Sequence, residues 1–215
     1  MDNRTRETVR YLGYKNGQID TKTLELVEDV FRELDKVVKP RSLYRTFVLT
    51  WKEDDIIQAG AMEIHSKNLA KNLKGCRQVI LLCGTLGVEV DYLLKRYSYT
   101  EMARTVVIQS CAAAMLEEYL DEQQEKIRTE MEKEGLYLRP RFSPGYGDFS
   151  ILHQKEILAM TEAAKKIGLT MTDSSMLTPT KSVTALIGLS TTEEHCHQKG
   201  CEVCNKTDCL YRRES

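Results

Sequence analysis

The amino-acid sequence predicts an α+β fold, with a mixed, largely antiparallel sheet, flanking helices and a Cys-rich C-terminal tail. Candidate strands and helices follow one another without regular βαβ alternation, which disfavours a doubly wound parallel sheet. The composition is that of a globular protein, because 41% hydrophobic and 29% charged residues suffice for a sizeable core. A length of 215 residues suits one domain with a small appendage, so we divide the chain into 1–190 and 191–215.

The helices are predicted from apolar residues at helical spacing and from residues that cap or break a helix. Asp20 is a plausible N-cap for the helix that Pro40 stops, and Ser66 is the corresponding residue of a shorter one. Asp148 or Ser150 is expected to cap a later helix. The helices are expected over residues 3–12, 20–39, 66–73, 88–97, 100–134 and 148–167.

The strands are predicted from stretches rich in β-branched and aromatic residues. The nearly continuous apolar run RQVILLC, at residues 77–83, is typical of a strand buried on both faces. Gly60 weakens the second candidate strand. The strands are expected over residues 42–50, 55–63, 77–83 and 182–190, with a short extended piece at 136–142.

Charge and hydropathy exclude several classes of function. With 31 basic and 32 acidic residues the formal net charge is −1, which predicts no basic surface for nucleic acid. The first ten residues are charged and lack the apolar segment of a secretory signal. No run of 18 apolar residues is present, so we expect no membrane span and a cytoplasmic protein.

The segment from Arg139 to Asp148 is the first candidate site. Two prolines and two glycines fix its path between two predicted helices, and a rigid connection is the more common explanation of that composition. However, Arg141 offers a planar fork for a carboxylate or phosphate, and Gly145 lets a ligand approach the backbone. Tyr146 adds a ring and a hydroxyl, so the segment suits a small anion without naming it.

The same residues carry a resemblance to a known family. Arg141-Phe142-Ser143-Pro144-Gly145-Tyr146 resembles the R-x-x-x-G-Y signature of the activation (reactivation) domain of cobalamin-dependent methionine synthase. VILLCGTLGVEVD at 79–91 and MLTPTKSVTALIGLS at 176–190 are similar to two other segments of that family, in the same order. The whole chain resembles the free-standing short relatives of that domain.

The resemblance implies an S-adenosylmethionine site at this segment. Arg141 would hold the carboxylate of the methionyl group, and Ser143 would contact the ligand mainly through its backbone. Gly145 would allow close approach, and Tyr146 would lie between the ligand and the corrin face. The family often continues with Pro-Ala-Cys-Pro, whereas this chain continues Gly147-Asp148-Phe149, so contacts beyond the tyrosine are not carried over.

The family's acidic ligand-binding residue finds no counterpart by resemblance. Glu132 and Glu134 precede the segment and would bring negative charge near the sulfonium, although the solvated end of a helix explains them more simply. The strand-to-helix turn at 85–87 lacks any phosphate-binding glycine motif, so we expect a plain tight connection there.

The function that the resemblance implies is support of reductive methylation (reactivation) of cobalamin. The cobalamin would be carried by the cobalamin-binding domain of a methionine synthase or by another corrinoid protein. The electron would come from a donor such as a flavodoxin or ferredoxin. No general base or nucleophile stands out, so we expect an accessory component of this methyltransferase system and of methionine biosynthesis. The alternatives are an iron–sulfur electron-transfer protein or a structural interaction protein that kept the fold without the ligand.

Four of the 7 cysteines crowd into the tail, at Cys196, Cys201, Cys204 and Cys209. Their spacing, C-x4-C-x2-C-x4-C, lets four thiolates surround one zinc ion or one iron–sulfur cluster. In a reducing compartment this pattern favours metal binding over disulfides. The family resemblance does not explain the tail. The other three cysteines fall in predicted core elements, where small buried thiols need no function.

Overall fold

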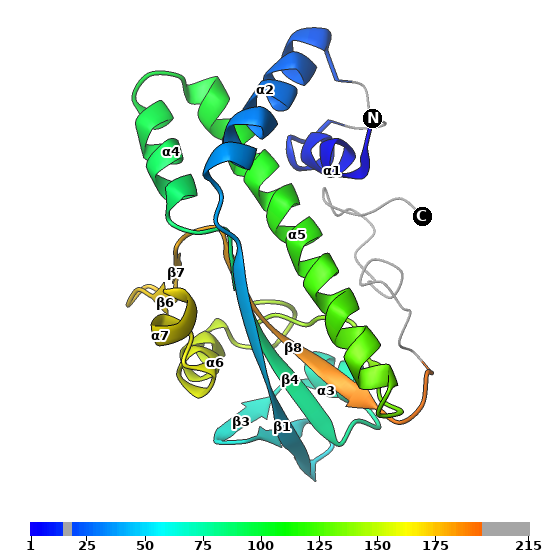
Figure 1. The fold of residues 1–215 in the computed structure, drawn as a ribbon. Coiled ribbons are helices and arrows are strands. Elements are labelled where there is room, and N and C mark those ends of the chain that lie inside the picture. Colours follow the sequence, from blue (N-terminus) through cyan, green and yellow to red (C-terminus); the bar gives the residue numbers. More distant parts are fainter. Residues whose placement is uncertain (15–18, 195–215) are drawn as a thin grey trace.

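The computed structural model describes residues 1–14 and 19–194, and its centre is a six-stranded antiparallel sheet (Figure 1). The strand order is β3-β2-β1-β4-β8-β5, so β1, β4 and β8 form the middle. A separate two-stranded sheet pairs β6 with β7. The bounds are β1 Arg41–Glu53, β2 Ile56–Ala59, β3 Met62–His65, β4 Gln78–Thr85, β5 Tyr137–Leu138, β6 Thr170–Met171, β7 Leu177–Thr178 and β8 Ser182–Ser190. This architecture confirms the predicted α+β class.

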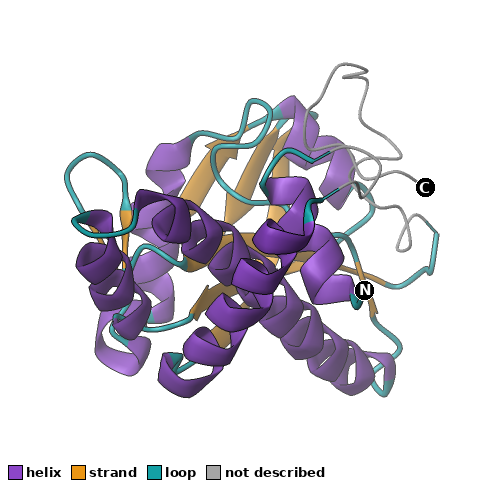
Figure 2. Cartoon of the chain, turned by 90° about the horizontal axis from the view of Figure 1, so that it is seen from above, coloured by secondary structure: helices purple, strands orange, loops and turns teal. Residues whose placement is uncertain are grey.

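Helices cover both faces of the sheet, and a view from above shows them around the strands (Figure 2). One face carries α1 (Asn3–Tyr11), α2 (Thr21–Val37), α4 (Glu89–Ser98) and the long α5 (Met102–Glu132). The other face carries α3 (Lys67–Leu73), α6 (Gln154–Thr161) and α7 (Ala163–Ile167). Among the described residues no helix is both long enough and apolar enough to cross a membrane.

The first five helices begin and end within two residues of the predicted ranges, and capping side chains mark the N-termini of α1, α2 and α3. Asp20 accepts a hydrogen bond from Thr23 N at 2.9 Å. Ser66 accepts one from Leu69 N at 3.0 Å. Each bond satisfies one of the main-chain N–H groups that a helix start leaves unpaired.

The middle strand β4 is buried on both faces, as its apolar run predicts. Successive side chains of a strand point to opposite faces, so alternate residues enter different cores. Ile80 and Leu82 pack under α2 and α5, whereas Val79 and Leu81 pack under α3 and α6. All four are at most 1% exposed.

Glycine and left-handed backbone explain where the elements differ from prediction. The expected strand at 55–63 is a hairpin, β2 and β3, which turns at Gly60 with φ 57°. The helix expected at 148–167 is a short 3-10 turn (Ile151–His153) followed by α6 and α7. Glu162 separates α6 from α7 because it adopts the left-handed conformation, with φ 58°. The small β6–β7 hairpin is too short to show a periodic pattern.

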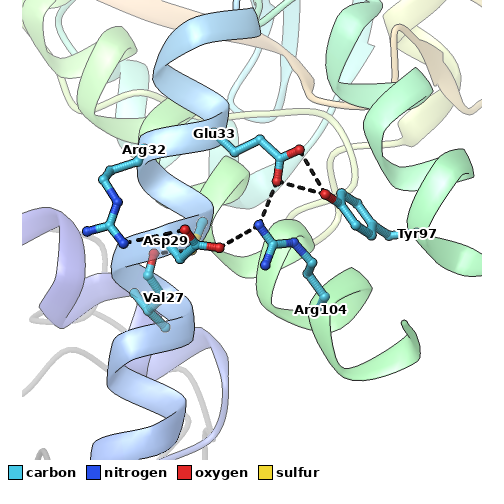
Figure 3. Close-up of polar contacts among 7 residues, drawn as sticks. Val27, Asp29, Arg32, Glu33, Tyr97 and Arg104 are labelled. Atoms are coloured by element: carbon cyan, nitrogen blue, oxygen red, sulfur yellow. Dashed lines mark hydrogen bonds and ion pairs between the residues drawn. The ribbon is translucent and has the colours of Figure 1, made fainter. Parts of the chain in front are cut away.

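A polar cluster joins the helices of the α5 face (Figure 3). Arg104 of α5 forms ion pairs with Glu33 and Asp29 of α2, each at 2.7 Å. Tyr97 of α4 donates a hydrogen bond to Glu33 at 2.9 Å. The cluster therefore links α2, α4 and the N-terminal half of the helix that also carries the candidate site.

Candidate functional site

Arg141 lies at the outer edge of the sheet, beside β8. The chain leaving α5 runs back along this strand, and Arg139 N donates to Gly188 O at 2.8 Å. Phe142 and Leu186 then exchange both main-chain hydrogen bonds, at 2.8 and 2.9 Å. Because side chains alternate along an extended segment, Phe142 enters the core under α6 and Arg141 turns toward α5.

Three polar side chains of α5 surround the guanidinium of Arg141. Its Nη2 atom lies 2.6 Å from Asp121 Oδ1 and 3.0 Å from Glu117 Oε2. Its Nη1 atom donates to Gln124 Oε1 at 3.1 Å. Glu117, Asp121 and Gln124 share one helix face, being four and three residues apart. The Arg141 side chain is only 16% exposed, so this charge is held in a fixed place.

The simpler interpretation of Glu132 and Glu134, the solvated end of a helix, is confirmed, and other carboxylates lie at this site. Glu132 and Glu134 are exposed near the C-terminal end of α5, and the acidic neighbours of Arg141 are Glu117 and Asp121. The signal that could have found them is the i, i+4 spacing of two carboxylates on one face of a predicted helix. Which basic group they meet depends on tertiary packing.

Beyond Phe142 the chain leaves the sheet and forms a tight loop. Pro144 has no N–H and cannot extend the pairing with β8. Gly145 adopts φ 92°, and its N–H donates to Phe149 O at 2.7 Å. Phe149 is 1% exposed and anchors the loop in the core. Tyr146, in contrast, is 69% exposed at the loop tip, so its ring is open to a ligand or a partner.

Ser143, for which the resemblance implies a backbone contact with the ligand, lies between the β8 pairing and the loop tip. It is half-buried at the start of the loop, and its carbonyl accepts a hydrogen bond from Tyr146 N at 3.2 Å. The structure thus places Arg141 in the extended segment beside β8, and Ser143, Gly145 and Tyr146 in the loop that follows it.

Asp148 holds this loop against α3 and is not the N-cap of the following helix. It accepts hydrogen bonds from Ser66 Oγ at 2.5 Å, Lys67 N at 2.8 Å and Asn68 N at 3.1 Å. Burial opposes ionisation, but these hydrogen bonds outweigh it and lower the pKa of Asp148. The capping role expected of Asp148 or Ser150 belongs to Ser150, which accepts from Leu152 N at 3.3 Å.

Gly147 explains the departure from the family's sequence after the tyrosine. It has φ 56°, and a Cβ atom there would lie 2.4 Å from Asn68 Nδ2. A side chain at position 147 would be strained by the positive φ and would force the Asn68 side chain to shift, so glycine favours the close approach by which Asp148 reaches the N-terminus of α3. In this chain, Gly147-Asp148 is a docking element for the loop.

One stretch of β8 beside this loop has no strand partner. Main-chain groups alternate sides along a strand, so Thr184 directs its N–H and C=O to the same side as Leu186. On that side of β8, the described residues form two pairings. The strand β5 pairs with residues 189 and 190, and Phe142 forms an isolated bridge with Leu186. The free edge of β8, free in the sense that no described strand pairs with it, therefore lies between Arg141 and the start of the strand, and Thr184 within it is only 2% exposed.

The cysteines of the tail lie outside the described residues. This holds for Cys196, Cys201, Cys204 and Cys209. Within the described part of the chain, no three His, Cys, Asp or Glu side chains are grouped for a metal ion.

The three remaining cysteines are buried in the core, in agreement with the role predicted for them. They are Cys76, Cys83 and Cys111. Burial raises the pKa of Cys83 to about 11 and that of Cys111 to about 12. Both therefore stay protonated and unreactive near neutral pH.

Comparison with known proteins identifies the fold. No protein-family model matches the chain, and no curated protein matches it. A solved structure, the MetH reactivation domain bound to AdoHcy, has a similar fold. The similarity covers 91% of this chain and 76% of the chain in that structure. The TM-score is 0.64 and the sequence identity 15%. The chain therefore has the fold of the MetH reactivation domain, as the resemblance in its sequence predicted.

Proposed function

We propose that this chain binds S-adenosylmethionine (AdoMet) beside Arg141. The observation that carries the proposal is one guanidinium held between two carboxylates on a single helix face. This set matches an amino-acid group, whose carboxylate pairs with Arg141 and whose ammonium pairs with Glu117 or Asp121. The solved structure of similar fold contains AdoHcy, the demethylated form of the same compound, and this supports the choice of ligand.

The net charge of the cluster favours AdoMet over AdoHcy. One guanidinium and two carboxylates leave one excess negative charge at the site. AdoMet carries a sulfonium in addition to its amino-acid zwitterion, so its net charge complements that excess, whereas AdoHcy lacks the sulfonium. Attraction between partly desolvated opposite charges stabilises the complex with AdoMet. Gly145 and the Ser143 backbone line the approach, and the exposed Tyr146 ring faces outward from the bound ligand.

Charge variants test this assignment by calorimetric titration. Glu117→Gln and Asp121→Asn should weaken AdoMet binding more than AdoHcy binding, because only AdoMet carries the sulfonium charge. Glu125→Gln is the matched control, since Glu125 lies on the same helix and pairs with Arg128. Equal losses for the two ligands in both site variants would contradict the proposed role of the acidic pair.

We propose further that the bound AdoMet serves a separate cobalamin protein. Reactivation transfers the methyl group of AdoMet together with one electron from a donor such as a flavodoxin or ferredoxin. This chain would bind and orient the methyl donor, and the corrinoid protein would dock over the loop tip. The exposed apolar side chains there, Tyr146, Ile151 and Leu152, suit such a contact.

Reactivation in trans tests the partner role. An inactive cobalamin-dependent methionine synthase without its own reactivation domain is mixed with this chain, AdoMet and a reductant. We expect the absorbance of methylcobalamin and methionine formation to return only when the chain and AdoMet are both present. Measurable AdoMet binding without any recovery would leave the ligand site standing and refute the role as an accessory protein.

The C-terminal cysteines carry a separate proposal. We propose that Cys196, Cys201, Cys204 and Cys209 hold a zinc ion or an iron–sulfur cluster, on the strength of their number and spacing. Metal analysis and a visible spectrum of the purified full chain distinguish the two. About one zinc without colour indicates a zinc site, whereas iron with absorbance that bleaches on reduction indicates a redox cluster. Neither metal in the wild type, or equal metal in Cys201→Ser, would contradict the site.

A further inference from the structure

Lys181 is a half-buried cation without a counter-ion among the residues that the structure describes. It directly precedes β8, and its Nζ atom donates to the main-chain oxygen of Gln109 in α5 at 3.0 Å. No carboxylate of the described residues lies within 4.0 Å of this ammonium. The nearby Asp91 instead accepts hydrogen bonds from Thr180, through its N–H at 3.1 Å and through its hydroxyl. Burial lowers the pKa of Lys181, and the charge of Asp91 opposes that shift.

The backbone around Lys181 is fixed by several hydrogen bonds. Its own carbonyl accepts from Leu86 N at 2.9 Å. Ser182 Oγ donates to Pro179 O at 2.6 Å and lies 2.8 Å from Thr85 Oγ1. The segment between β7 and β8 is thus tied to the end of β4 and, through Asp91, to α4 (Figure 1). A half-buried ammonium without a nearby counter-ion is less favourable for folding than a paired one, and groups of this kind concentrate at ligand sites.

Lys181 and Arg141 lie on the same flank of α5. Alternate residues of β8 face this helix, among them Val183 and Ile187, and Lys181 shares their side. Phe142 pairs with Leu186, which places Arg141 beside Ile187. The two cations therefore mark the two ends of the free edge of β8. Lys181 contacts Gln109 of α5, and Arg141 contacts Glu117 of the same helix. These two helix residues are eight positions apart, which corresponds to about 12 Å along the helix axis.

We propose that Lys181 contacts the nucleoside half of the ligand whose amino-acid half binds at Arg141. This inference rests on the proposed AdoMet site and names its second anchor. Lys181 would donate its remaining N–H groups to ribose oxygens or to adenine ring nitrogens, while the methionyl group lies between Arg141 and the acidic pair. It is a binding residue and takes no part in methyl transfer.

The test is a titration of the full-length wild type, Lys181→Met and Lys95→Met with AdoHcy. Methionine keeps the length of the lysine stem but removes the charge, and Lys95 is an exposed lysine of α4 that serves as the control. We expect Lys181→Met to weaken binding about tenfold or more, the loss typical of a hydrogen bond to a charged group. Lys95→Met should bind as the wild type, and Lys181→Arg should retain part of the affinity.

Thermal unfolding without ligand supplies a second readout. Because the ammonium has no counter-ion to lose, Lys181→Met should unfold at the wild-type temperature or above it. A lower unfolding temperature would show that Lys181 is a structural group and overturn the inference. Wild-type binding with an unchanged Kd in Lys181→Met would also overturn it and leave the AdoMet site intact. No binding by the wild type would instead refute the proposed function.

Discussion

The helical layer above the sheet is predicted to depend on Arg104, and Arg104→Met tests that dependence. The side chain is 14% exposed, and its Nη2 atom lies 2.7 Å from both Glu33 Oε2 and Asp29 Oδ2. The guanidinium also stacks 4.8 Å above the ring of Tyr97, which itself hydrogen-bonds to Glu33 (Figure 3). Methionine keeps the apolar stem and removes only these polar interactions.

The contacts of Arg104 contribute unequally to the free energy of unfolding, because its partners differ in exposure to solvent. Glu33 is only 23% exposed, so its hydrogen-bonded pair with Arg104 should contribute about 1.5–3 kcal/mol. Asp29 is 49% exposed, and solvent screening limits its pair to about 0–1 kcal/mol. The contact with the Tyr97 ring adds about 0.5–1 kcal/mol. Arg104→Met should therefore lower the free energy of unfolding by about 2–5 kcal/mol.

The assay is urea unfolding followed by circular dichroism, with a double-mutant cycle to Glu33→Gln. We expect a coupling between the two positions of at least ~1 kcal/mol, because each variant removes the same partly buried pair. Arg32→Met is the control, since Arg32 is 66% exposed and pairs only with Asp29, at 3.4 Å. A loss below ~0.5 kcal/mol for Arg104→Met, equal to that of the control, would refute the reasoning.

Two other substitutions probe the loop and the strand that frame the site. Asp148→Ala should lower stability by about 0.5–2 kcal/mol at neutral pH, because it removes the side chain that accepts from the N-terminal N–H groups of α3. Because the pKa of Asp148 is lowered from 3.8, its contribution is complete above that value and is lost as the pH falls below it. Denaturant midpoints between pH 2 and 7 should therefore vary less in the variant, and an unchanged pH dependence would contradict this role. Gly188→Ala should cost about 1–3 kcal/mol by overpacking, because its Cβ would lie 2.7 Å from both Cys76 Sγ and Leu73 Cδ2. A wild-type melting temperature would show that this contact is not tight.

Local signals in the sequence were sufficient for most of the fold. The caps Asp20 and Ser66 and the apolar spacing set the helices, and the apolar run at 77–83 identified the central strand. The hairpin at Gly60 and the break at Glu162 each depend on one residue with left-handed backbone. A glycine in the sequence suggests that such a conformation can occur, whereas a glutamate gives no such signal.

The candidate site was predictable only in part, because its partners come from distant segments. The R-x-x-x-G-Y pattern located Arg141, but Glu117 and Asp121 precede it by 24 and 20 residues and meet it only after α5 packs beside β8. Of the two caps expected for the helix that follows, Ser150 takes that role, whereas Asp148 reaches Ser66 and α3, about 80 residues away. Lys181 showed no local signal, since its isolation is visible only in three dimensions.

The central claim is that Arg141 holds the carboxylate of S-adenosylmethionine, and calorimetric titration of the wild type and Arg141→Met tests it most directly. We predict saturable binding of AdoMet with one site per chain. Loss of the guanidinium from this charged site should weaken binding by about 2–5 kcal/mol, roughly thirtyfold or more. Arg141→Lys should fall between the two, because it keeps the charge and loses the planar fork. No binding by the wild type, or equal affinity in wild type and Arg141→Met, would contradict the account.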